Sequence, residues 1–410
     1  MSEIVTRCCI VGGGPAGMML GFLLARAGVE VVVLEKHADF LRDFRGDTIH
    51  PSTLEVMHEL GLLDEFLQLP HTRAHTLGGA FGAEQFTFVD FGHLPTRCKF
   101  IALMPQWDFL NFLARQGKRF ANFHLRMKTE ATDLMEQGGR VVGVRGKTPD
   151  GPLDIRANLV VACDGRHSTL RERAGMKVED LGAPMDVLWF RLAHKPGDSD
   201  QSMGRFEAGR LIVLIDRGDY WQCAYVIPKG AYESVRQRGL ETFRANLAAS
   251  VPMFADRVAE LQGWDQVKLL TVAVDRLKTW HRPGLLCLGD AAHAMSPIGG
   301  VGVNLAVQDA VAAANLLWEP LTRGAPTDAD LARVQQRREF PARVTQWIQV
   351  TLQKNVISRA LQAKGELKAP PPIRLLARFP LLRRIPARLL GLGVRPEHAR
   401  SPQRITQTAG

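Results

Sequence analysis

The sequence predicts an α/β fold made of a discontinuous doubly wound domain, an inserted domain built on an antiparallel sheet, and a C-terminal helical region. Three observations support this prediction. A strand, a glycine-rich turn, a helix and a second strand open the chain in the order of a βαβ unit. Buried strands return at residues 153–162 and 284–288. Short strands of alternating polarity occupy residues 81–104 and 186–228, which indicates a separate sheet.

Each element of this layout has its own signal in the sequence. Apolar or β-branched runs predict the strands, and apolar periodicity with glycine or proline at the ends predicts the helices. Gly61 is the expected C-cap of one helix, and Pro341 is expected to kink another. In chain order we expect a strand at 8–11, helices at 16–25 and 51–67, strands at 29–34, 86–91, 140–145, 153–162, 210–216, 220–227 and 284–288, helices at 302–318 and 328–361, and a linker at 370–372.

These elements divide the chain into six segments. The doubly wound domain is expected to take residues 1–75, 105–180 and 281–325, and the inserted domain residues 76–104 and 181–280. The remaining residues, 326–410, are expected to form C-terminal helices and a basic tail.

Composition places the chain among ordinary globular proteins. It has 410 residues, of which 46% are hydrophobic and 23% charged, so a large core can form. We find neither an apolar run of the ~20 residues that span a bilayer nor a secretory signal. The six cysteines occur without a C-x-x-C pair or a metal-ligand spacing. We therefore predict a reduced, cytoplasmic protein with no metal site.

The positive charge of the chain is concentrated at its end. The net charge is +10, but ten basic and only two acidic residues lie from residue 361 onward, so +8 of it belongs to the last 50 residues. Because the rest of the chain is nearly neutral, nucleic-acid binding is not predicted.

The first glycine cluster predicts a dinucleotide site. Gly12, Gly14 and Gly17 form G-x-G-x-x-G between a strand and a helix, where the first glycine permits a tight turn, the second lets backbone N–H groups approach a pyrophosphate, and the third allows close packing. Glu35 follows 18 residues after Gly17, at the tip of the next strand, where a carboxylate can accept from ribose hydroxyls. The alternative is a glycine-rich turn with a surface glutamate.

Two further motifs carry a resemblance to a known family. Residues 163–171 resemble the D-G-x-x-S-x-x-R segment of the single-component aromatic hydroxylases, the para-hydroxybenzoate hydroxylase family of flavoprotein monooxygenases. Residues 289–304 are similar to the G-D-A-x-H-x-x-x-P-x-x-G-x-G-x-N segment of the same family. The three motifs stand in the order of the family over nearly 300 residues.

The resemblance implies non-covalently bound FAD. The glycines would hold its pyrophosphate, Glu35 the adenosine ribose, Arg45 and Gln106 the ribityl region, and Asp290 a ribityl hydroxyl. Backbone N–H groups at the start of the last helix would stabilise negative charge on the reduced flavin. The implied FAD-binding residues are Gly12, Gly14, Pro15, Ala16, Gly17, Glu35, Lys36, Arg45, Gln106, Ala131, Asp164, Asp290, Gly300, Gly302, Val303 and Asn304.

Several of these positions have a plain structural alternative. For Asp290 the alternative is a helix cap without cofactor contact, and for Arg171 it is an anchor of its segment. His293 is expected to order its loop rather than act as a base. Asp164 is implied to lie near the pyrophosphate and the approach of the nicotinamide. A second G-x-G-x-x-G after a strand is absent from the sequence, which fits a family whose pyridine nucleotide binds transiently.

The activity implied is that of an FAD-dependent monooxygenase. NAD(P)H would reduce the flavin, O2 would form a C4a-hydroperoxide, and its distal oxygen would hydroxylate a small aromatic or quinol-type substrate. A non-catalytic flavoprotein that senses or sequesters a ligand is the alternative of a different class. A flavin-dependent halogenase is a weaker alternative, because its W-x-W-x-I-P signature is reduced here to the final Ile227-Pro228. The protein is expected to be a monomer or homodimer.

Catalytic residues are not assigned by the sequence. Pro297 would lie along the flavin by resemblance, and the inserted sheet should supply the pocket walls. For each wall candidate a role in the sheet core is an equal alternative, and Arg217 also fits an ordinary charged hairpin turn. The candidates are Pro297, Trp189, Arg191, Phe206, Arg217, Trp221 and Tyr225.

The basic tail has a repeating pattern of its own. Paired leucines alternate with arginines over residues 373–390, so short helices around Pro380 would have an apolar stripe edged by positive charge. Packing of the leucines on the protein is the favoured interpretation, because two prolines interrupt the helix. Contact with an anionic membrane surface is the alternative.

Overall fold

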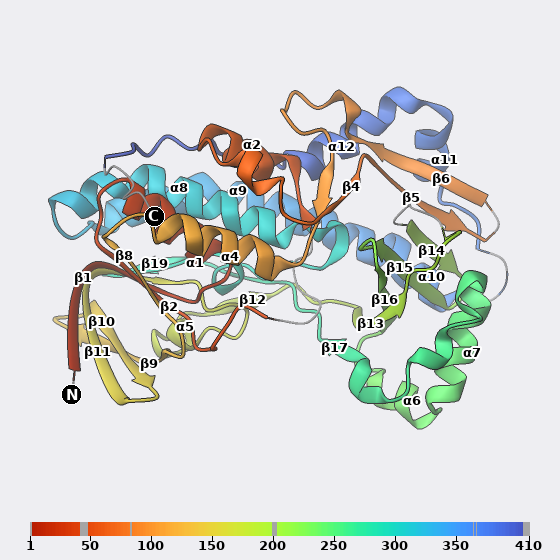
Figure 1. Cartoon of the computed structure of the whole chain (residues 1–410), viewed down its shortest axis with the longest axis horizontal. Coiled ribbons are helices and arrows are strands. Elements are labelled where there is room, and N and C mark those ends of the chain that lie inside the picture. Colours follow the sequence, from red (N-terminus) through yellow and green to blue (C-terminus); the bar gives the residue numbers. More distant parts are fainter. Residues whose placement is uncertain are drawn as a thin grey trace.

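The computed structural model describes residues 2–41, 48–82, 84–198, 203–363, 365 and 367–404. Two main sheets organise them, and Figure 1 shows one at each end of the molecule. Long helices run along the side of the first sheet and reach toward the second. The α/β fold predicted from the sequence is confirmed.

The first sheet has eight strands and a parallel centre in the order β20-β11-β1-β2-β8. β19 pairs antiparallel at one edge, and β10 and β9 extend from β11 as an antiparallel meander. The strands are β1 (Ser2–Val11), β2 (Val31–Leu34), β8 (Phe123–Arg126), β9 (Glu130–Gln137), β10 (Arg140–Thr148), β11 (Gly151–Ala162), β19 (His281–Arg282) and β20 (Leu285–Cys287). Since segments far apart in sequence meet here, the domain is discontinuous, as predicted.

The helices of this domain pack around α1 (Pro15–Arg26) and α8 (Gly302–Arg323), which contact each other. Proline at the first position and an almost entirely apolar sequence explain why α1 forms at this place and is buried. The other helices near this sheet are α2 (Pro51–Glu59), α3 (Leu63–Phe66), α4 (Gln106–Gly117), α5 (Thr169–Arg173) and α9 (Asp328–Leu352). The expected helix at 51–67 is divided into α2 and α3, because Gly61 takes φ +71° after α2.

By length and composition, residues Ile298–Arg323 are the one segment of the described chain that can cross a membrane. Buried residues make up 67% of its most apolar window. That burial is typical of a core helix, and α8 lies in the largest hydrophobic cluster of the protein.

The second sheet has seven strands in the order β17-β13-β16-β15-β14-β5-β6. All neighbouring pairs are antiparallel except β14 and β5, which are parallel. The strands are β5 (Thr76–Phe81), β6 (Glu84–Asp90), β13 (Met185–Ala193), β14 (Met203–Glu207), β15 (Arg210–Asp216), β16 (Tyr220–Pro228) and β17 (Lys268–Leu270). Helices α6 (Tyr232–Gln237) and α7 (Leu240–Ser250) cover one face.

Smaller sheets join the two parts. β7 (Ile101–Leu103) pairs with both β3 (Thr48–Ile49) and β4 (Thr72–Ala74). β12 (Val178–Asp180) pairs with β18 (Asp275–Leu277). The domain boundaries given in the sequence analysis stay predictions.

The C-terminal region begins with a long helical stretch. α9 continues through Pro341 into a π-helical turn at Gln353–Ile357 and then into α10 (Ser358–Gln362), which contacts β14, β15 and β16. Two short helices follow, α11 (Pro371–Arg378) and α12 (Arg384–Gly391), both packed on β6.

The final stretch, residues 395–404, runs back across the first domain. Asn315 of α8 donates to the carbonyl oxygen of His398 at 2.8 Å, and Arg26 of α1 donates to that of Ser401 at 2.7 Å. Residues 395–404 therefore contact two helices, α1 and α8, that lie much earlier in the sequence.

Candidate cofactor and substrate site

The glycine turn between β1 and α1 is closely packed at two of its three motif positions. Gly12 has φ +108°, and a Cβ there would lie 2.2 Å from the carbonyl oxygen of Cys163. A Cβ on Gly17 would lie 2.0 Å from the carbonyl oxygen of Gly12. These positions require glycine because β1, α1 and the end of β11 meet there.

Gly14 differs from its two neighbours in the motif, because a Cβ at Gly14 would meet no atom within 4 Å. It is the N-cap of α1, and within the described chain no side chain caps this helix and no acidic residue occupies its first turn. In α9, by contrast, Thr327 and Asp330 form a capping box. The unpaired N–H groups and positive end of α1 therefore face open space, as a pyrophosphate site requires.

Glu35 lies directly beside this turn. Its side chain is buried, Oε2 accepts from the Gly13 N–H at 3.1 Å, and Oε1 accepts from the His37 N–H at 3.0 Å. The adjacent Lys36 is exposed, and Ala131 is buried at the start of β9. The carboxylate is thus fixed at the end of β2, where the sequence predicts a ribose contact.

Asp164 follows β11 and lies against Gly12. Its Oδ2 accepts from the Leu170 N–H at 3.2 Å, while Oδ1 is buried and has no hydrogen-bond partner among the described residues. Burial raises the pKa of the Asp164 carboxyl. An unsatisfied buried oxygen next to the glycine turn fits a group that a bound ligand completes.

Arg171 holds the segment of Asp164 in place. Its guanidinium is buried and donates to the carbonyl oxygen of Ala291 at 3.0 Å and to that of Arg166 at 2.6 Å. Since both acceptors are backbone groups, the structure gives Arg171 the anchoring role that the sequence left as one of two alternatives.

Asp290 lies at the meeting point of two helices. A Cβ on the preceding Gly289 would lie 3.3 Å from the Cβ atoms of both Ala16 in α1 and Ala306 in α8. The Asp290 carboxylate is partly exposed and forms an ion pair with Arg166 at 3.4 Å. One ion pair leaves acceptor positions on the carboxylate for a ligand hydroxyl.

We expect Asp290→Ala to weaken FAD retention by about 10- to 150-fold in dissociation constant, the equivalent of one charge-assisted hydrogen bond of roughly 1.5–3 kcal/mol. Flavin fluorescence on titration of the apoprotein measures this constant. Arg166→Ala separates the two roles of the carboxylate, because it removes the ion pair and leaves the carboxylate in place. An unchanged constant in Asp290→Ala would leave Asp290 with a purely structural role.

The start of α8 is also uncapped within the described chain. Its N-cap is Val301, and no acidic residue lies in the first turn, which begins at Gly302 and Val303. The N–H groups of this turn are therefore available to a partial negative charge, and their contact with a reduced flavin stays a prediction.

The side chain of Asn304 is fully engaged within the protein. Its Oδ1 accepts from the His50 N–H at 2.8 Å and the Thr53 hydroxyl at 2.7 Å, and its Nδ2 donates to the carbonyl oxygen of Thr48 at 3.1 Å. A Cβ on Gly300 would lie 2.2 Å from Thr48 Oγ1, so this turn also requires close approach. Asn304 therefore positions the start of α8 against β3 and α2.

The other two predicted ribityl contacts are less defined. Gln106 is half-buried at the first position of α4. Arg45 lies outside the described residues. Both stay predictions.

His293 belongs to a buried ionic network that sequence analysis did not find. Its Nε2 and Asp309 Oδ2 are 2.6 Å apart, and Arg338 Nε donates to Asp309 Oδ1 at 2.9 Å. Arg338 also contacts Glu397 Oε1 at 3.4 Å. Burial alone would raise the pKa of Asp309, but His293 and Arg338 hold it below its usual value. The network fixes the loop after Asp290, which is the role expected of His293.

The pocket candidates divide between the two faces of the second sheet. Trp189 and Phe206 are half-buried on the face that packs against Ile298, the residue after Pro297. Phe206 stacks on Phe81 with ring centroids 4.4 Å apart. This face adjoins the loop that precedes α8, and the flavin-facing role that the family resemblance implies for it stays a prediction.

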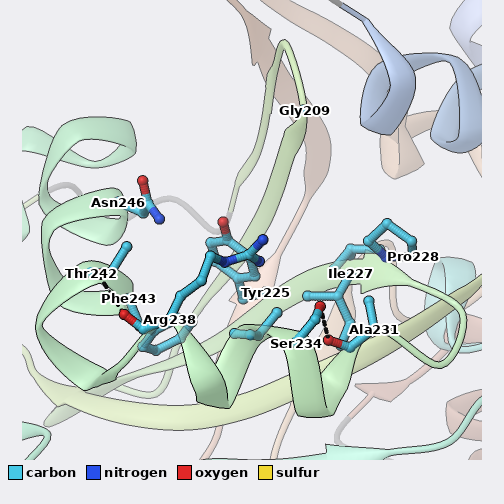
Figure 2. Close-up of a pocket in the computed structure, with 12 residues that line it drawn as sticks. Gly209, Tyr225, Ile227, Pro228, Ala231, Ser234, Arg238, Thr242, Phe243 and Asn246 are labelled. Carbon is cyan, nitrogen blue, oxygen red and sulfur yellow. Dashed lines mark hydrogen bonds between the residues drawn. The ribbon is translucent and has the colours of Figure 1, made fainter.

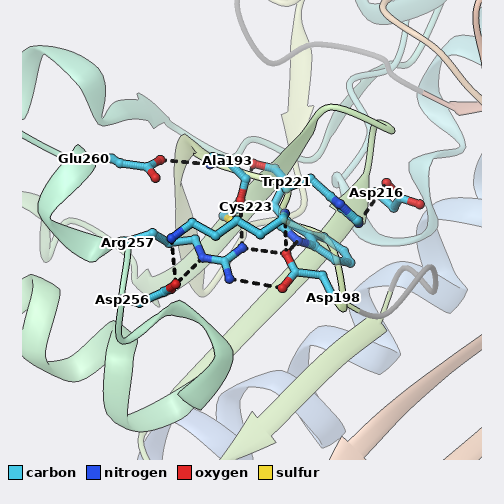
Figure 3. Close-up of polar contacts among 10 residues, drawn as sticks. Ala193, Asp198, Asp216, Trp221, Cys223, Asp256, Arg257 and Glu260 are labelled. Atoms are coloured by element: carbon cyan, nitrogen blue, oxygen red, sulfur yellow. Dashed lines mark hydrogen bonds and ion pairs between the residues drawn. The ribbon is translucent and has the colours of Figure 1, made fainter.

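The placement of Trp221 favours the alternative of a role in the sheet core. Strand alternation places it on the opposite face, fully buried under α7 and its neighbours. Its Nε1 donates to Asp198 at 2.9 Å, and Asp198 forms an ion pair with the buried Arg257 (Figure 3). Arg257 holds the pKa of Asp198 well below its usual range, although burial opposes this. Trp221 is thus part of a structural network.

Tyr225 shares this placement, and its role as a pocket wall stays a prediction. It lies on the face of Trp221 and lines a pocket of about 200 Å³ between β16 and the two covering helices (Figure 2). Burial raises the pKa of its phenol. Ser234 of α6, Asn246 of α7 and Arg238 between the two helices line the same pocket. This pocket opens on the side of the sheet away from Ile298.

The two arginine candidates contact the sheet itself. Arg191 is exposed and lies over the ring of Tyr220, 4.8 Å from its centroid. Arg217 donates through Nε and Nη2 to Gln222 Oε1, each at 3.0 Å, which favours the structural alternative of a stabilised hairpin.

His50 is a further residue that the sequence did not single out. It is fully buried, and its Nδ1 donates to the carbonyl oxygen of Leu390 in α12 at 2.8 Å. Burial lowers the pKa of His50 to about 4. A Cβ on Gly299 would lie 2.7 Å from Leu390 Cδ1. The C-terminal helix therefore reaches the loop before α8.

Comparison with known proteins is consistent with this geometry. Residues 5–348 match the family described as FAD binding domain. The chain is 33% identical over 396 residues to a 6-methylpretetramide 4-monooxygenase of Streptomyces rimosus, covering 94% of this chain and 92% of that protein. It is 28% identical to a rifampicin monooxygenase of Rhodococcus hoagii, covering 78% of this chain but 64% of that longer protein.

Solved structures show the same fold. The structure of pqsL, a probable FAD-dependent monooxygenase from Pseudomonas aeruginosa, aligns with a TM-score of 0.73 at 23% identity, covering 87% of this chain and 98% of that one. The myxobacterial halogenase CndH aligns with a TM-score of 0.72 at 18% identity, covering 94% of this chain and 97% of that one. At these identities the structural alignments support the fold alone. The family match and the first relative go further: the chain belongs to the FAD-dependent aromatic monooxygenases, and FAD is its cofactor.

Proposed function

We propose that this enzyme uses NAD(P)H and O2 to hydroxylate a phenolic or quinol-type aromatic substrate with fused rings. The observation that carries the proposal is the convergence of two uncapped helix N-termini, those of α1 and α8, on the turn at Gly289 and Asp290. An extended dinucleotide flavin needs donors at its pyrophosphate and at its ring, and these two helices supply them on one side of one sheet.

The chain would bind the flavin, orient the substrate and shield the site from water. The flavin would accept the hydride and transfer oxygen through its C4a-hydroperoxide. Glu35 and the Gly14 turn would hold the adenosine and pyrophosphate end. Asp290 would accept from a ribityl hydroxyl, and the first turn of α8 would stabilise charge on the ring. Asp164, with its unsatisfied oxygen, would lie where a nicotinamide approaches.

The substrate would lie between the loop 297–300 and the half-buried face of the second sheet. That face presents Trp189, Phe206 and Val213, partly buried apolar side chains suited to contact with aromatic rings. The name of the relative from Streptomyces rimosus supports fused-ring phenols as the class to try first. The six cysteines are free and buried, which supports a reducing compartment, and we propose the cytoplasm.

A substrate screen tests this function. Purified holoenzyme is incubated with NADH or NADPH and with phenols, anthranilates, hydroxypyridines or fused-ring quinols, while coenzyme oxidation and product mass are recorded. Stimulated oxidation with gain of one oxygen atom is the expected result. Ligand binding without stimulation would favour the sensor alternative, and a halide-dependent product would favour the halogenase.

Variants on the two faces of the second sheet test the location of the substrate. Phe206→Ala is expected to lower kcat/KM by about 10- to 30-fold, because it removes apolar contact on the proposed substrate face. The control, Tyr225→Phe, changes the opposite face and is expected to stay within about twofold. A larger loss of kcat/KM in Tyr225→Phe than in Phe206→Ala would place the substrate in the pocket under α6 and α7.

A further inference from the structure

The C-terminal helices α11 and α12 have an inner face that is packed on the protein. Ala387 and Leu392 are buried in a cluster with Val89 and Phe91, and Leu390 packs against the same cluster. This part of the tail behaves as the favoured sequence interpretation expects.

A second face of the same segment stays in solvent. Leu375 and Phe379 are 50% exposed, Leu381 69%, Ile385 60% and Leu389 44%. These five residues, with the arginines between them, are called the tail face below. Among the large apolar side chains exposed on the described chain, no other five lie so close together in sequence. Exposed apolar groups clustered in this way indicate an interaction surface.

Arginines are interleaved with the apolar side chains at helical spacing. Arg378 stands between Leu375 and Phe379, Arg384 between Leu381 and Ile385, and Arg388 between Ile385 and Leu389, each time at positions i, i+3 and i+4. Residues three and four apart share one face of a helix. Each apolar contact is therefore flanked by a guanidinium.

The charge of the tail face is not neutralised within the described chain. Residues 371–391 contain five arginines and no acidic residue. Arg383 is used internally, since it donates to the carbonyl oxygens of Leu376 and Ala377 at 3.0 and 2.8 Å. The other four are exposed, and among the described residues no carboxylate forms an ion pair with them. The face thus combines an apolar surface with unbalanced positive charge.

We propose that the tail face docks on an anionic lipid surface. Apolar side chains would enter the acyl boundary, and the arginine stems would lie along it with their guanidinium groups at the lipid phosphates. Charge complementarity decides for this occupant over a second copy of the chain, because two copies would bring like-charged arginine rows together. Figure 1 shows α11 and α12 at the outer edge of the molecule, where a planar surface can reach them.

Docking would bring the substrate loop close to the bilayer, a step that rests on the proposed function. Leu390 in α12 contacts the turn at Gly299, and its carbonyl oxygen accepts from buried His50. The inner face of α12 therefore lies beside the proposed substrate position while its outer face would lie on lipid. A lipophilic aromatic substrate dissolved in the membrane would have a short path to the site.

Co-sedimentation of the full-length holoenzyme with vesicles tests the docking without reference to activity. We expect binding to vesicles of phosphatidylcholine with 30% phosphatidylglycerol, little binding to phosphatidylcholine alone, and loss of binding in high salt. Arg378→Gln with Arg388→Gln should weaken binding by about 25-fold, or about fivefold per arginine. Leu381→Ser with Ile385→Ser should weaken it further without unfolding the protein, since both side chains are exposed.

The matched control is Lys147→Gln with Lys177→Gln, which removes two exposed positive charges outside the tail. It should bind as the parent protein does. Absence of binding to anionic vesicles, or equal binding by the tail and control variants, would overturn the proposal. Concentration-dependent dimerisation that is lost in Leu381→Ser with Ile385→Ser would assign the face to a second copy instead. Activity on a water-soluble phenol reports the proposed function separately.

Discussion

A Gly14→Glu variant is expected to purify folded and colourless, because its side chain and charge would occupy the open space before α1. The backbone at Gly14 has φ −76° and ψ −175°, which other residues adopt, and a Cβ there meets no atom within 4 Å. The substitution should therefore spare the fold and act on the cofactor alone. Its absorbance at flavin wavelengths, relative to protein, measures occupancy.

Two variants of neighbouring glycines make this test specific. Gly14→Ala adds a methyl group in open space and should keep most of the flavin. Gly12→Ala should lower the stability of the protein itself, because its Cβ would collide with the backbone of Cys163 at a φ of +108°. Full flavin occupancy in Gly14→Glu would place the pyrophosphate elsewhere.

The largest loss of stability is expected from Asp309→Asn. This change removes the charge that His293 and Arg338 share, and it leaves the Arg338 guanidinium, 1% exposed, with the more distant Glu397 as its carboxylate partner. Breaking a buried ion pair from one side typically costs about 3–5 kcal/mol. Urea unfolding of the variant and the parent protein measures the difference in free energy of unfolding.

The control is Asp133→Asn, whose exposed carboxylate lies 3.8 Å from Arg145 and should contribute less than about 1 kcal/mol. The pH dependence has a defined sign. Because the pKa of Asp309 is lowered in the folded protein, its contribution is complete above the unfolded value of about 4 and is lost as pH falls through the folded value. Equal stability of the two variants would mean that the network does not hold the loop.

Local chemistry explains which parts of the protein the sequence could predict. Strand β15 has the bounds expected from its apolar run, and α1 begins beside the predicted glycine turn, because each signal lies within a few residues. The family motifs identified the cofactor for the same reason. Each motif joins a strand to a loop or helix whose geometry depends on nearby residues.

The wall residues could not be predicted in this way. Alternation along β16 shows that Trp221 and Tyr225 share a face, but not which face meets Ile298. That choice depends on α6 and α7, which pack over one side from later in the chain. Asp309, Arg338 and His50 were missed because their partners lie 16, 29 and 340 residues away.

The return of residues 395–404 across the first domain constrains how the enzyme is made. A ribosome delivers the glycine turn long before Glu397. Until that glutamate has emerged, Arg338 lacks one carboxylate partner, and Gln308 lacks the backbone N–H of Glu397 that its side chain accepts. The nascent chain can thus build the sheet before the cofactor domain is complete. Flavin loading should accordingly require synthesis through residues 395–404, and ribosome-bound chains lacking these residues should stay apoprotein.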